Sequence, residues 1–332
     1  MTAMTTLGET GELDLVAAIV ARLPSSAQVL LGPGDDAAVV ATPDGRVVAT
    51  TDVLVEGVHF RRDWSEAVDV GHKAAAQNLA DVAAMGARPL ALLVGLAAPA
   101  TLPTQWALGL ADGLAAEAAK TGAAVVGGDV VAGERVTVSV TALGSLEGRE
   151  PVTRAGARPG DVVAVCGRLG WSAGGLAVLS RGFRSPRALV AAHRRPEPPY
   201  EAGPAAALAG ATAMVDVSDG LLGDLAQVAL ASGVRMRVEV AAFEVPAALR
   251  DAAAALGKDP LEWVLTGGED HALAATFPSA GQVPAGWTVI GEVLALAGPS
   301  SAPQDPAGPR VTVSGLPAGA YEGPGGWRHF SA

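Results

Sequence analysis

Lysine is almost absent from this chain of 332 residues, which contains only Lys73, Lys120 and Lys258. None of the three lies in a Gly-x-x-x-x-Gly-Lys-Ser/Thr loop, so the common lysine-containing phosphate loop is excluded. The chain has 23 basic and 34 acidic residues, which give a formal net charge of −11. An acidic chain without a run of Lys or Arg is not expected to bind nucleic acid.

Cysteine and long apolar runs are equally scarce. The single cysteine, Cys166, ends the apolar run 162–166, so an internal disulfide is excluded and a buried strand residue is expected. A reducing, cytoplasmic setting is therefore the default expectation. The N-terminal residues lack the pattern of a signal peptide, and the longest apolar run, Pro89–Pro99, is too short to span a bilayer. We expect no contact with a membrane.

The residues that are present favour a two-domain α/β protein. Half of them are hydrophobic, and the length suggests about two domains of roughly 150 residues each. Strand-like and helix-like segments alternate along the chain, as in α/β architectures. The stretch 145–160 is rich in Gly, Arg and Pro and poor in apolar residues. We place the domain boundary there, which gives domains 1–148 and 149–332.

Several predicted strands lead directly into an aspartate. The strand Arg46–Thr51 is expected to end in Asp52, and Ala123–Val126 is expected to lead into Gly127-Gly128-Asp129. A third strand, Ala213–Val217, precedes Ser218-Asp219-Gly220. Helices are expected over Leu13–Leu23, Val68–Met85, Thr104–Thr121 and Leu176–Arg181. A Gly-rich turn is expected over 167–175, and the Pro-rich stretch 184–204 is expected to be irregular.

Aspartates beside Gly, Ser or Thr are well suited to bind a hard cation such as Mg²⁺, which takes oxygen ligands. Because lysine is scarce, metals held by carboxylates offer the better way to neutralise a polyphosphate. The candidate ligands are Asp35, Asp52, Asp81, Asp129, Asp216 and Asp219. Asp35 and Asp36 are adjacent, so only one of them points into a given site, and we favour Asp35. Each motif alone also fits a turn or a helix cap.

Two basic side chains are further candidates. Arg154 stands near the domain boundary, where it either grips a phosphate or is simply an exposed turn residue. His59 follows Asp52 by seven residues, and it either contacts substrate or packs beside Phe60.

A short motif also fits a serine hydrolase. Gly170-Trp171-Ser172-Ala173-Gly174 matches Gly-x-Ser-x-Gly, and Asp216 and His271 follow in the chain order of that class. The pattern occurs by chance in Gly- and Ala-rich chains, and it gives no role to the acidic motifs of the first half. The milder interpretation is a Gly-rich turn that permits close approach of backbone.

Taken together, the motifs resemble those of the thiamine-monophosphate kinase family. The matching strings are Gly-Pro-Gly-Asp-Asp-Ala-Ala at 32–38, Thr-Thr-Asp-Val-Leu-Val-Glu-Gly-Val-His-Phe at 50–60, Asn-Leu-Ala-Asp-Val-Ala-Ala-Met-Gly-Ala at 78–87, Gly-Gly-Asp at 127–129, Asp-Val-Ser-Asp-Gly-Leu at 216–221 and Leu-Thr-Gly-Gly-Glu-Asp at 265–270. Their order and spacing cover nearly the whole chain, to the final Gly-Trp-Arg-His-Phe.

The resemblance implies ATP-dependent phosphorylation of thiamine monophosphate to thiamine diphosphate. It implies a homodimer in which the N-terminal sheets of two subunits form a barrel, a C-terminal α/β sandwich domain that completes the nucleotide and substrate site, and several Mg²⁺ ions. The implied metal-binding residues are Asp35, Thr50, Thr51, Asp52, Asp81, Asp129, Asp216 and Asp219. The implied ATP contacts are Gly128, Asp129, Arg154 and Ser218. The implied substrate contacts are His59, Glu269 and Trp327, whose aromatic face suits a cationic ring.

The chemistry of this acceptor predicts the mechanism. A phosphate monoester is already ionised near neutral pH, so no general base is required. What the reaction requires is relief of repulsion between two anionic phosphates and in-line alignment, which metals held by aspartates provide. We expect direct transfer without a phosphoenzyme.

The chain departs from the family pattern at three points. Ala80 stands where Ser is usual, His271-Ala272 replaces Tyr-Glu, and Trp327 stands where Tyr is more usual. Other functions that stay open are aminoimidazole-ribonucleotide synthetase, the serine hydrolase, and a nucleotide-binding regulator without catalysis.

Overall fold

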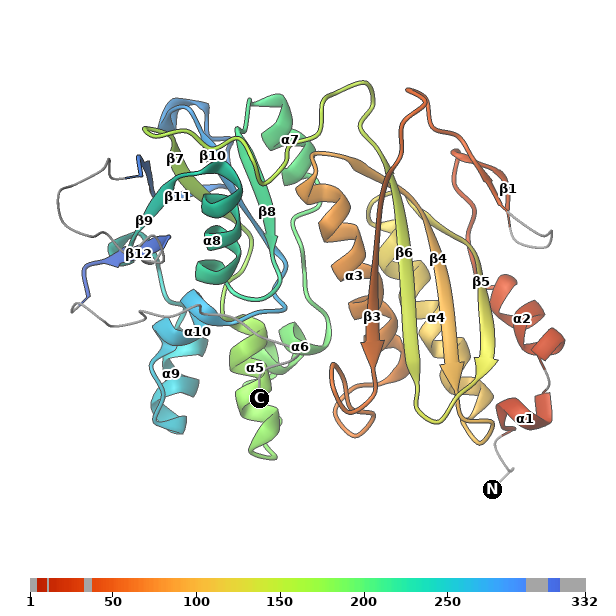
Figure 1. Ribbon diagram of the computed structural model, residues 1–332. Helices are drawn as coiled ribbons and strands as arrows, with labels where there is room; N and C mark the ends of the chain where they lie inside the picture. The colour runs from red at the N-terminus through yellow and green to blue at the C-terminus, as the bar shows by residue number, and fades with distance from the viewer. Residues whose placement is uncertain (1–4, 11, 33–37, 297–309, 317–332) are drawn as a thin grey trace. The chain divides into compact units, whose positions relative to one another are not determined.

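The computed structural model describes residues 5–10, 12–32, 38–296 and 310–316 (Figure 1). The chain divides into two compact units. The first contains residues 1–83, 87–150 and 194–196, and the second contains 84–86, 151–193 and 197–332. Both units combine helices with a mixed sheet, which confirms the predicted two-domain α/β fold.

The first unit is built on a four-stranded sheet in the order β3-β6-β4-β5. Its main elements are β3 (Val48–Val55), α3 (Ala67–Ala84), β4 (Arg88–Ala98), α4 (Thr104–Ala119), β5 (Ala124–Ala132) and β6 (Thr137–Ser145). β6 is antiparallel to β3 and β4, whereas β4 and β5 are parallel and are joined through α4. Preceding them are α1 (Leu7–Thr10), α2 (Glu12–Val20), β1 (Val29–Leu31) and β2 (Val39–Val40).

In the part of the chain that the structure describes, the helices α3 and α4 cover one face of this sheet. Along β6, Val138 and Val140 are buried, while Ser139 and Thr141, which alternate with them, are half-buried. This alternation is typical of a strand with one face on a core. The helices α3 and α4 lie behind the sheet in Figure 1. In the described residues of a single subunit the sheet stays open and forms no closed barrel.

The longest helix, α3, is also deeply buried. Ala75, Ala76 and Leu79 are fully inaccessible, and Lys73 is 2% exposed. Small alanines allow this helix to pack closely against its neighbours. Within the described ranges, no helix is both long and apolar enough to cross a bilayer.

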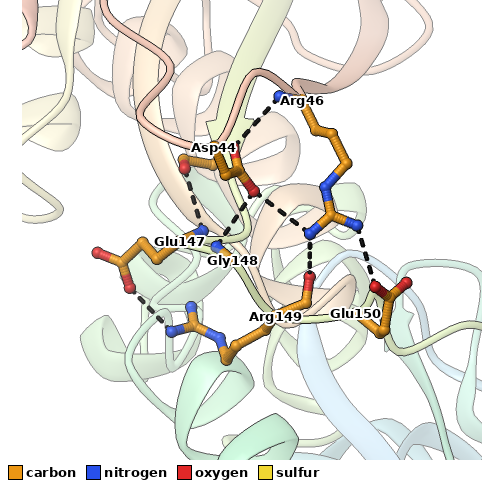
Figure 2. Close-up of polar contacts among 7 residues, drawn as sticks. Asp44, Arg46, Glu147, Gly148, Arg149 and Glu150 are labelled. Atoms are coloured by element: carbon orange, nitrogen blue, oxygen red, sulfur yellow. Dashed lines mark hydrogen bonds and ion pairs between the residues drawn. The ribbon is translucent and has the colours of Figure 1, made fainter.

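A polar network connects the two turns at one end of the first sheet (Figure 2). Arg46, just before β3, donates to the Arg149 carbonyl at 2.8 Å and to Glu150 Oε1 at 3.2 Å. The Gly148 N–H donates to Asp44 Oδ2 at 3.1 Å, and this bond is the main cause that lowers the pKa of Asp44. The network therefore fixes the chain where the first unit ends.

The second unit contains a six-stranded sheet in the order β12-β9-β11-β7-β10-β8. Its strands are β7 (Val162–Cys166), β8 (Ala213–Val217), β9 (Arg235–Glu239), β10 (Ala272–Phe277), β11 (Thr288–Leu294) and β12 (Val311–Ser314). Its helices are α5 (Trp171–Ser180), α6 (Arg187–Arg194), α7 (Ala202–Leu208), α8 (Leu221–Ser232), α9 (Ala247–Leu256) and α10 (Pro260–Thr266), with short 3₁₀ turns at Val240–Ala242 and Ala280–Gln282. All pairings are antiparallel except that of β12 with β9.

Three local predictions were wrong. Asp52 and Asp129 lie inside β3 and β5 and not at their ends, because both strands continue their ladders for three further residues. The predicted Gly-rich turn is shorter, since α5 already begins at Trp171. The predicted irregular stretch 184–204 contains α6, which starts directly after Pro186, a position where the missing proline N–H is tolerated.

Candidate active site

One group of candidate residues lies on the helix-covered face of the first sheet. Thr50 and Asp52 are two residues apart on β3, so both point to the same face as the buried Leu54. The Thr50 hydroxyl donates to Asp81 Oδ2 of α3 at 2.7 Å. The sequence predicted all three as metal ligands, and the structure brings Thr50 and Asp81 into direct contact. Their oxygen atoms are ligands that Mg²⁺ accepts.

Asp129 lies on the opposite face of the same sheet. Asp52 is in register with Val140, Val94 and Gly128 across the four strands, whereas Asp129 is one residue further along β5. Because side chains alternate, Asp129 points away from the face that carries Asp52. The two strands are three spacings apart, about 14 Å at roughly 4.8 Å each. Within one subunit the two carboxylates therefore cannot bind the same ion.

Thr51 shares the open face with Asp129. It accepts a hydrogen bond from the Thr141 hydroxyl at 3.1 Å and donates to the Val140 carbonyl at 3.0 Å. Thr50 and Thr51 thus point to opposite faces of β3, so their side chains serve different sites.

Gly128 is required by the close approach of β5 to β4. A Cβ atom at this position would lie 2.0 Å from the Val94 carbonyl oxygen, so no larger residue fits. A pocket of about 960 Å³ adjoins Gly128, and its walls come from α2, α4 and the sheet. Asp129 is the charged residue on these walls, which are otherwise mainly apolar. A pocket of this size and character is typical of small-molecule sites.

His59 is held by two backbone contacts beyond the end of β3. Its Nδ1 accepts a hydrogen bond from the Val55 N–H at 3.0 Å, and Lys73 Nζ donates to its carbonyl at 3.1 Å. Since Nδ1 is an acceptor, the proton of the neutral ring lies on Nε2, which can donate to a ligand. Phe60 stacks on Trp106 with 6.4 Å between ring centroids. The aromatic packing at this point is therefore made by Phe60.

In the second unit, three carboxylates surround the start of α8. Asp216 is buried on β8, and Asp219 follows it by three residues. Asp224 accepts hydrogen bonds at 3.1 Å from the N–H groups of Asp219 and Gly220. Burial, together with the charges of Asp216 and Asp219, raises the pKa of Asp224 to about 7. A cation bound here would relieve this repulsion.

Asp224 was not among the residues predicted from sequence. It stands in the first turn of α8, where an acidic residue is an ordinary capping feature. Its nearness to Asp216 depends on how β8 packs on α8, which no local motif indicates.

The loop before β10 presents Glu269 in an unusual backbone conformation. Glu269 and His271 have φ values of 64° and 53°, which non-glycine residues rarely adopt. The Glu269 N–H donates to the Ser218 carbonyl at 2.7 Å, and the His271 N–H donates to the Val217 carbonyl at 3.1 Å. Such strained residues persist where the surrounding contacts determine the loop, and they cluster at functional sites.

His271, the departure from the family pattern, is buried beside a predicted metal ligand. Its Nδ1 lies 3.2 Å from Asp216 Oδ2. The replacement therefore places a nitrogen hydrogen-bonding group against Asp216.

Ser172 does not occupy the position of a hydrolase nucleophile. Its side chain is buried, with 1% of the residue exposed, so a substrate has no access to the hydroxyl. Its Oγ lies 3.0 Å from Nδ1 of His193, whereas the predicted histidine, His271, contacts Asp216. The structure thus gives no support to a triad of Ser172, Asp216 and His271.

Asp270 caps α5 from a distant part of the chain. Its Oδ1 accepts a hydrogen bond from the Ser172 N–H at 2.8 Å, and its Oδ2 is buried with no hydrogen-bond partner. Burial raises the pKa of Asp270 to about 7, against the lowering effect of the N–H groups of Ser172 and Gly170.

This shift predicts a measurable pH dependence of stability. The unfolded carboxyl has a pKa near 3.8, so between about pH 4 and pH 7 the folded chain holds an extra proton. The free energy of unfolding should therefore fall as pH rises through this window. Asn cannot ionise, so this part of the pH dependence should be absent from Asp270→Asn. Between pH 5 and pH 8 the free energy of unfolding of the wild type should therefore fall by about 2–4 kcal/mol more than that of the variant. Urea unfolding of both proteins at the two pH values checks this, and parallel losses would contradict it.

Other predicted residues are more isolated or lie outside the described part. Arg154 is exposed between β6 and β7, and its carbonyl accepts a hydrogen bond from Ser232 at 2.9 Å. Ser218 is half-buried directly after β8. Asp35, Asp36 and Trp327 lie outside the described residues. Among the residues that the structure does describe, no three His, Cys, Asp or Glu side chains are grouped as a metal site requires.

Comparisons with known proteins cover almost the whole chain. Residues 34–146 match the family model for the N-terminal domain of AIR synthase related proteins, and residues 158–296 match that for the C-terminal domain. The chain is 50% identical over 326 residues to the thiamine-monophosphate kinase of Mycobacterium tuberculosis, which covers 98% of this chain and 93% of that protein.

Solved structures give the same result. A thiamine-monophosphate kinase from Stenotrophomonas maltophilia K279a is similar with a TM-score of 0.76 and 34% identity, covering 91% of this chain and 96% of that chain. A structure of AaThiL complexed with AMPPCP and TMP is similar with a TM-score of 0.76 and 32% identity, covering 99% of this chain and 100% of that chain.

Proposed function

Since the chain belongs to the thiamine-monophosphate kinase family, within the AIR synthase related proteins, we propose that it transfers the γ-phosphate of ATP to thiamine monophosphate. The product is thiamine diphosphate. The observation that carries this proposal is the identity to the mycobacterial kinase over nearly the full length of both chains. The AaThiL structure with an ATP analogue and TMP supports the same pair of substrates.

We assign the metal sites to Mg²⁺. The proposed ligands are Asp35, Thr50, Thr51, Asp52, Asp81, Asp129, Asp216 and Asp219. Hard oxygen donors are what this ion requires. The contact of the Thr50 hydroxyl with the Asp81 carboxylate supplies two such donors side by side. When bound, Mg²⁺ neutralises phosphate oxygens and so reduces the repulsion between donor and acceptor.

The proposed ATP contacts are Gly128, Asp129, Arg154 and Ser218. Gly128 and Asp129 are both exposed and line a pocket of suitable size. Ser218 and Arg154 supply a hydroxyl and a guanidinium for phosphate oxygens.

The substrate is assigned to His59, Glu269 and Trp327. Nδ1 of His59 accepts the Val55 N–H, so the Nε2–H of the neutral ring is the donor that we assign to an anionic phosphate. Glu269 offers a carboxylate to the cationic part of thiamine, and Trp327 offers an aromatic face.

No residue is assigned as general base. The acceptor oxygen of thiamine monophosphate is already ionised, so the protein need only align it with the γ-phosphate and shield the site. We propose direct in-line transfer without a covalent intermediate.

We further propose that the protein is a homodimer. Residues 1–148 are assigned to ATP, metal binding and dimerisation, and 149–332 complete the nucleotide and substrate contacts. The open face of the first sheet carries Val53, Leu93 and Val131 at 46%, 38% and 51% exposure. An uncovered apolar sheet face suits a second copy, which would close the sheets into a barrel.

The function is tested by incubating the purified protein with ATP, Mg²⁺ and thiamine monophosphate and separating the products. We expect equal amounts of thiamine diphosphate and ADP. Binding of ATP without any thiamine diphosphate would favour a nucleotide-binding regulator and contradict the proposal.

A further inference from the structure

A ring of polar contacts surrounds the loop that presents Glu269. Nδ1 of His193, on α6, lies 3.0 Å from Ser172 Oγ and 3.7 Å from Glu269 Oε2. The Ser172 N–H, on α5, donates to Asp270 Oδ1 at 2.8 Å. Because Glu269 and Asp270 are consecutive residues, these contacts form a closed ring.

Exposure differs sharply around this ring. His193 is 6% exposed and Ser172 is 1% exposed, whereas 33% of the Glu269 side chain is accessible. The buried members are fixed in the interior of the second unit, and Glu269 is the member that can reach a ligand.

The position of His193 is itself closely determined. A Cβ atom on Gly175 would lie 2.1 Å from the Leu189 carbonyl oxygen and 2.8 Å from Cβ of His193. The helices α5 and α6 therefore meet with almost no space between them, which leaves the His193 ring little freedom to move.

We propose that His193 is a positioning residue that holds the Glu269 carboxylate in the orientation required to bind the cationic substrate. This inference rests on the proposed kinase function. With a proton on Nδ1, this N–H donates to Ser172 Oγ, and the same edge of the imidazole faces the Glu269 carboxylate at 3.7 Å, an electrostatic contact and not a hydrogen bond. If His193 had only a packing role, its contact with the buried Ser172 would be sufficient. The second contact, with the partly exposed Glu269, indicates a role toward a ligand.

The contact should affect binding of thiamine monophosphate selectively. A glutamate has several rotatable side-chain bonds, and ordering it on binding has an entropic cost that prior positioning removes. Without His193, the KM for thiamine monophosphate should rise about 10-fold. The KM for ATP and kcat should change less than about 2-fold, because His193 is not among the residues assigned to ATP or to the transferred phosphate.

The test is a double-mutant cycle on the full-length protein. The variants are His193→Leu, Glu269→Gln and the double variant, measured for kcat, both KM values and melting temperature. We expect the rise in the KM for thiamine monophosphate with His193→Leu to disappear in the Glu269→Gln background, since the positioned carboxylate is then absent. His193→Asn, which keeps a donor near the place of Nδ1, should restore the KM to within about 3-fold of the wild type.

A matched control is present in the first unit. His72 Nδ1 lies 2.6 Å from Glu117 Oε2, and Glu117 is buried. His72→Leu should lower the melting temperature and leave the KM for thiamine monophosphate unchanged. If His193→Leu does not fold, Ser172→Ala provides a second test. It removes the hydroxyl that contacts the His193 imidazole and should raise the KM for thiamine monophosphate about 3-fold.

The outcomes separate this inference from the proposed function. A wild-type protein that forms no thiamine diphosphate would overturn both. An active wild type with an unchanged KM in His193→Leu, or an equal KM rise in the Glu269→Gln background, would overturn the role of His193 alone.

Discussion

Asp52→Asn and Asp129→Asn should each lower kcat/KM for thiamine diphosphate formation by about 10³-fold or more. Each change removes one negative charge while it preserves shape, so the variants should fold. Loss of a single group that stabilises the transferring phosphoryl group typically costs 10²–10³-fold, and loss of a metal ligand adds to that. Steady-state kinetics at saturating Mg²⁺ provide the measurement.

The matched control is Asp112→Asn, on the surface of α4. Asp112 pairs with Arg22 at 3.4 Å and is 49% exposed, so its replacement should leave activity within about 2-fold of the wild type. Full activity in Asp52→Asn and Asp129→Asn would refute the metal assignment. Since the two aspartates point to opposite faces of one sheet, loss in both variants would indicate that both faces contribute to the reaction.

Thiamine should be a far poorer acceptor than thiamine monophosphate, by about 10³-fold. Its hydroxyl must lose a proton during transfer, and a general base of the kind that contributes 10²–10⁴-fold is not among the residues assigned to the site. The phosphate monoester needs no such assistance, because its second pKa is near 6.

The same argument predicts the pH profile. The rate with thiamine monophosphate should rise through about pH 6 and level off above about pH 7, as the acceptor becomes the dianion. Initial rates with both acceptors over pH 5–9 test this. Comparable rates with thiamine would show that the site supplies a base and would contradict the mechanism.

The strands that carry the candidate residues could be predicted from sequence, but the face of the sheet to which each side chain points could not. The apolar run Ala213–Val217 is β8, as expected, because short runs of buried residues bounded by turn signals indicate strands. The strand Ala123–Val126 was predicted to stop before Gly127 and Gly128, yet both continue β5, and at Gly128 the parallel β4 passes so close that only glycine fits. That approach depends on pairing between strands, which a local pattern does not contain.

The contacts that hold the second unit's loop were equally invisible in the sequence. The helix α5 has no local capping side chain, since the carboxylate at its start comes from Asp270, 98 residues away along the chain. His193 lies in a stretch whose prolines suggested irregular structure, although α6 fits between them. Motif order predicts candidate binding residues, whereas long-range packing decides which residues position them.

The most direct test of the account is the Mg²⁺ dependence of single-turnover thiamine diphosphate formation. The wild type should form no product with excess chelator and recover fully as Mg²⁺ is added. Asp129→Asn should require at least about 10-fold more Mg²⁺ or fail to recover, as expected when a ligand is lost. Thiamine diphosphate formed at an undiminished rate with chelator would contradict the central claim that aspartate-held metals support this transfer.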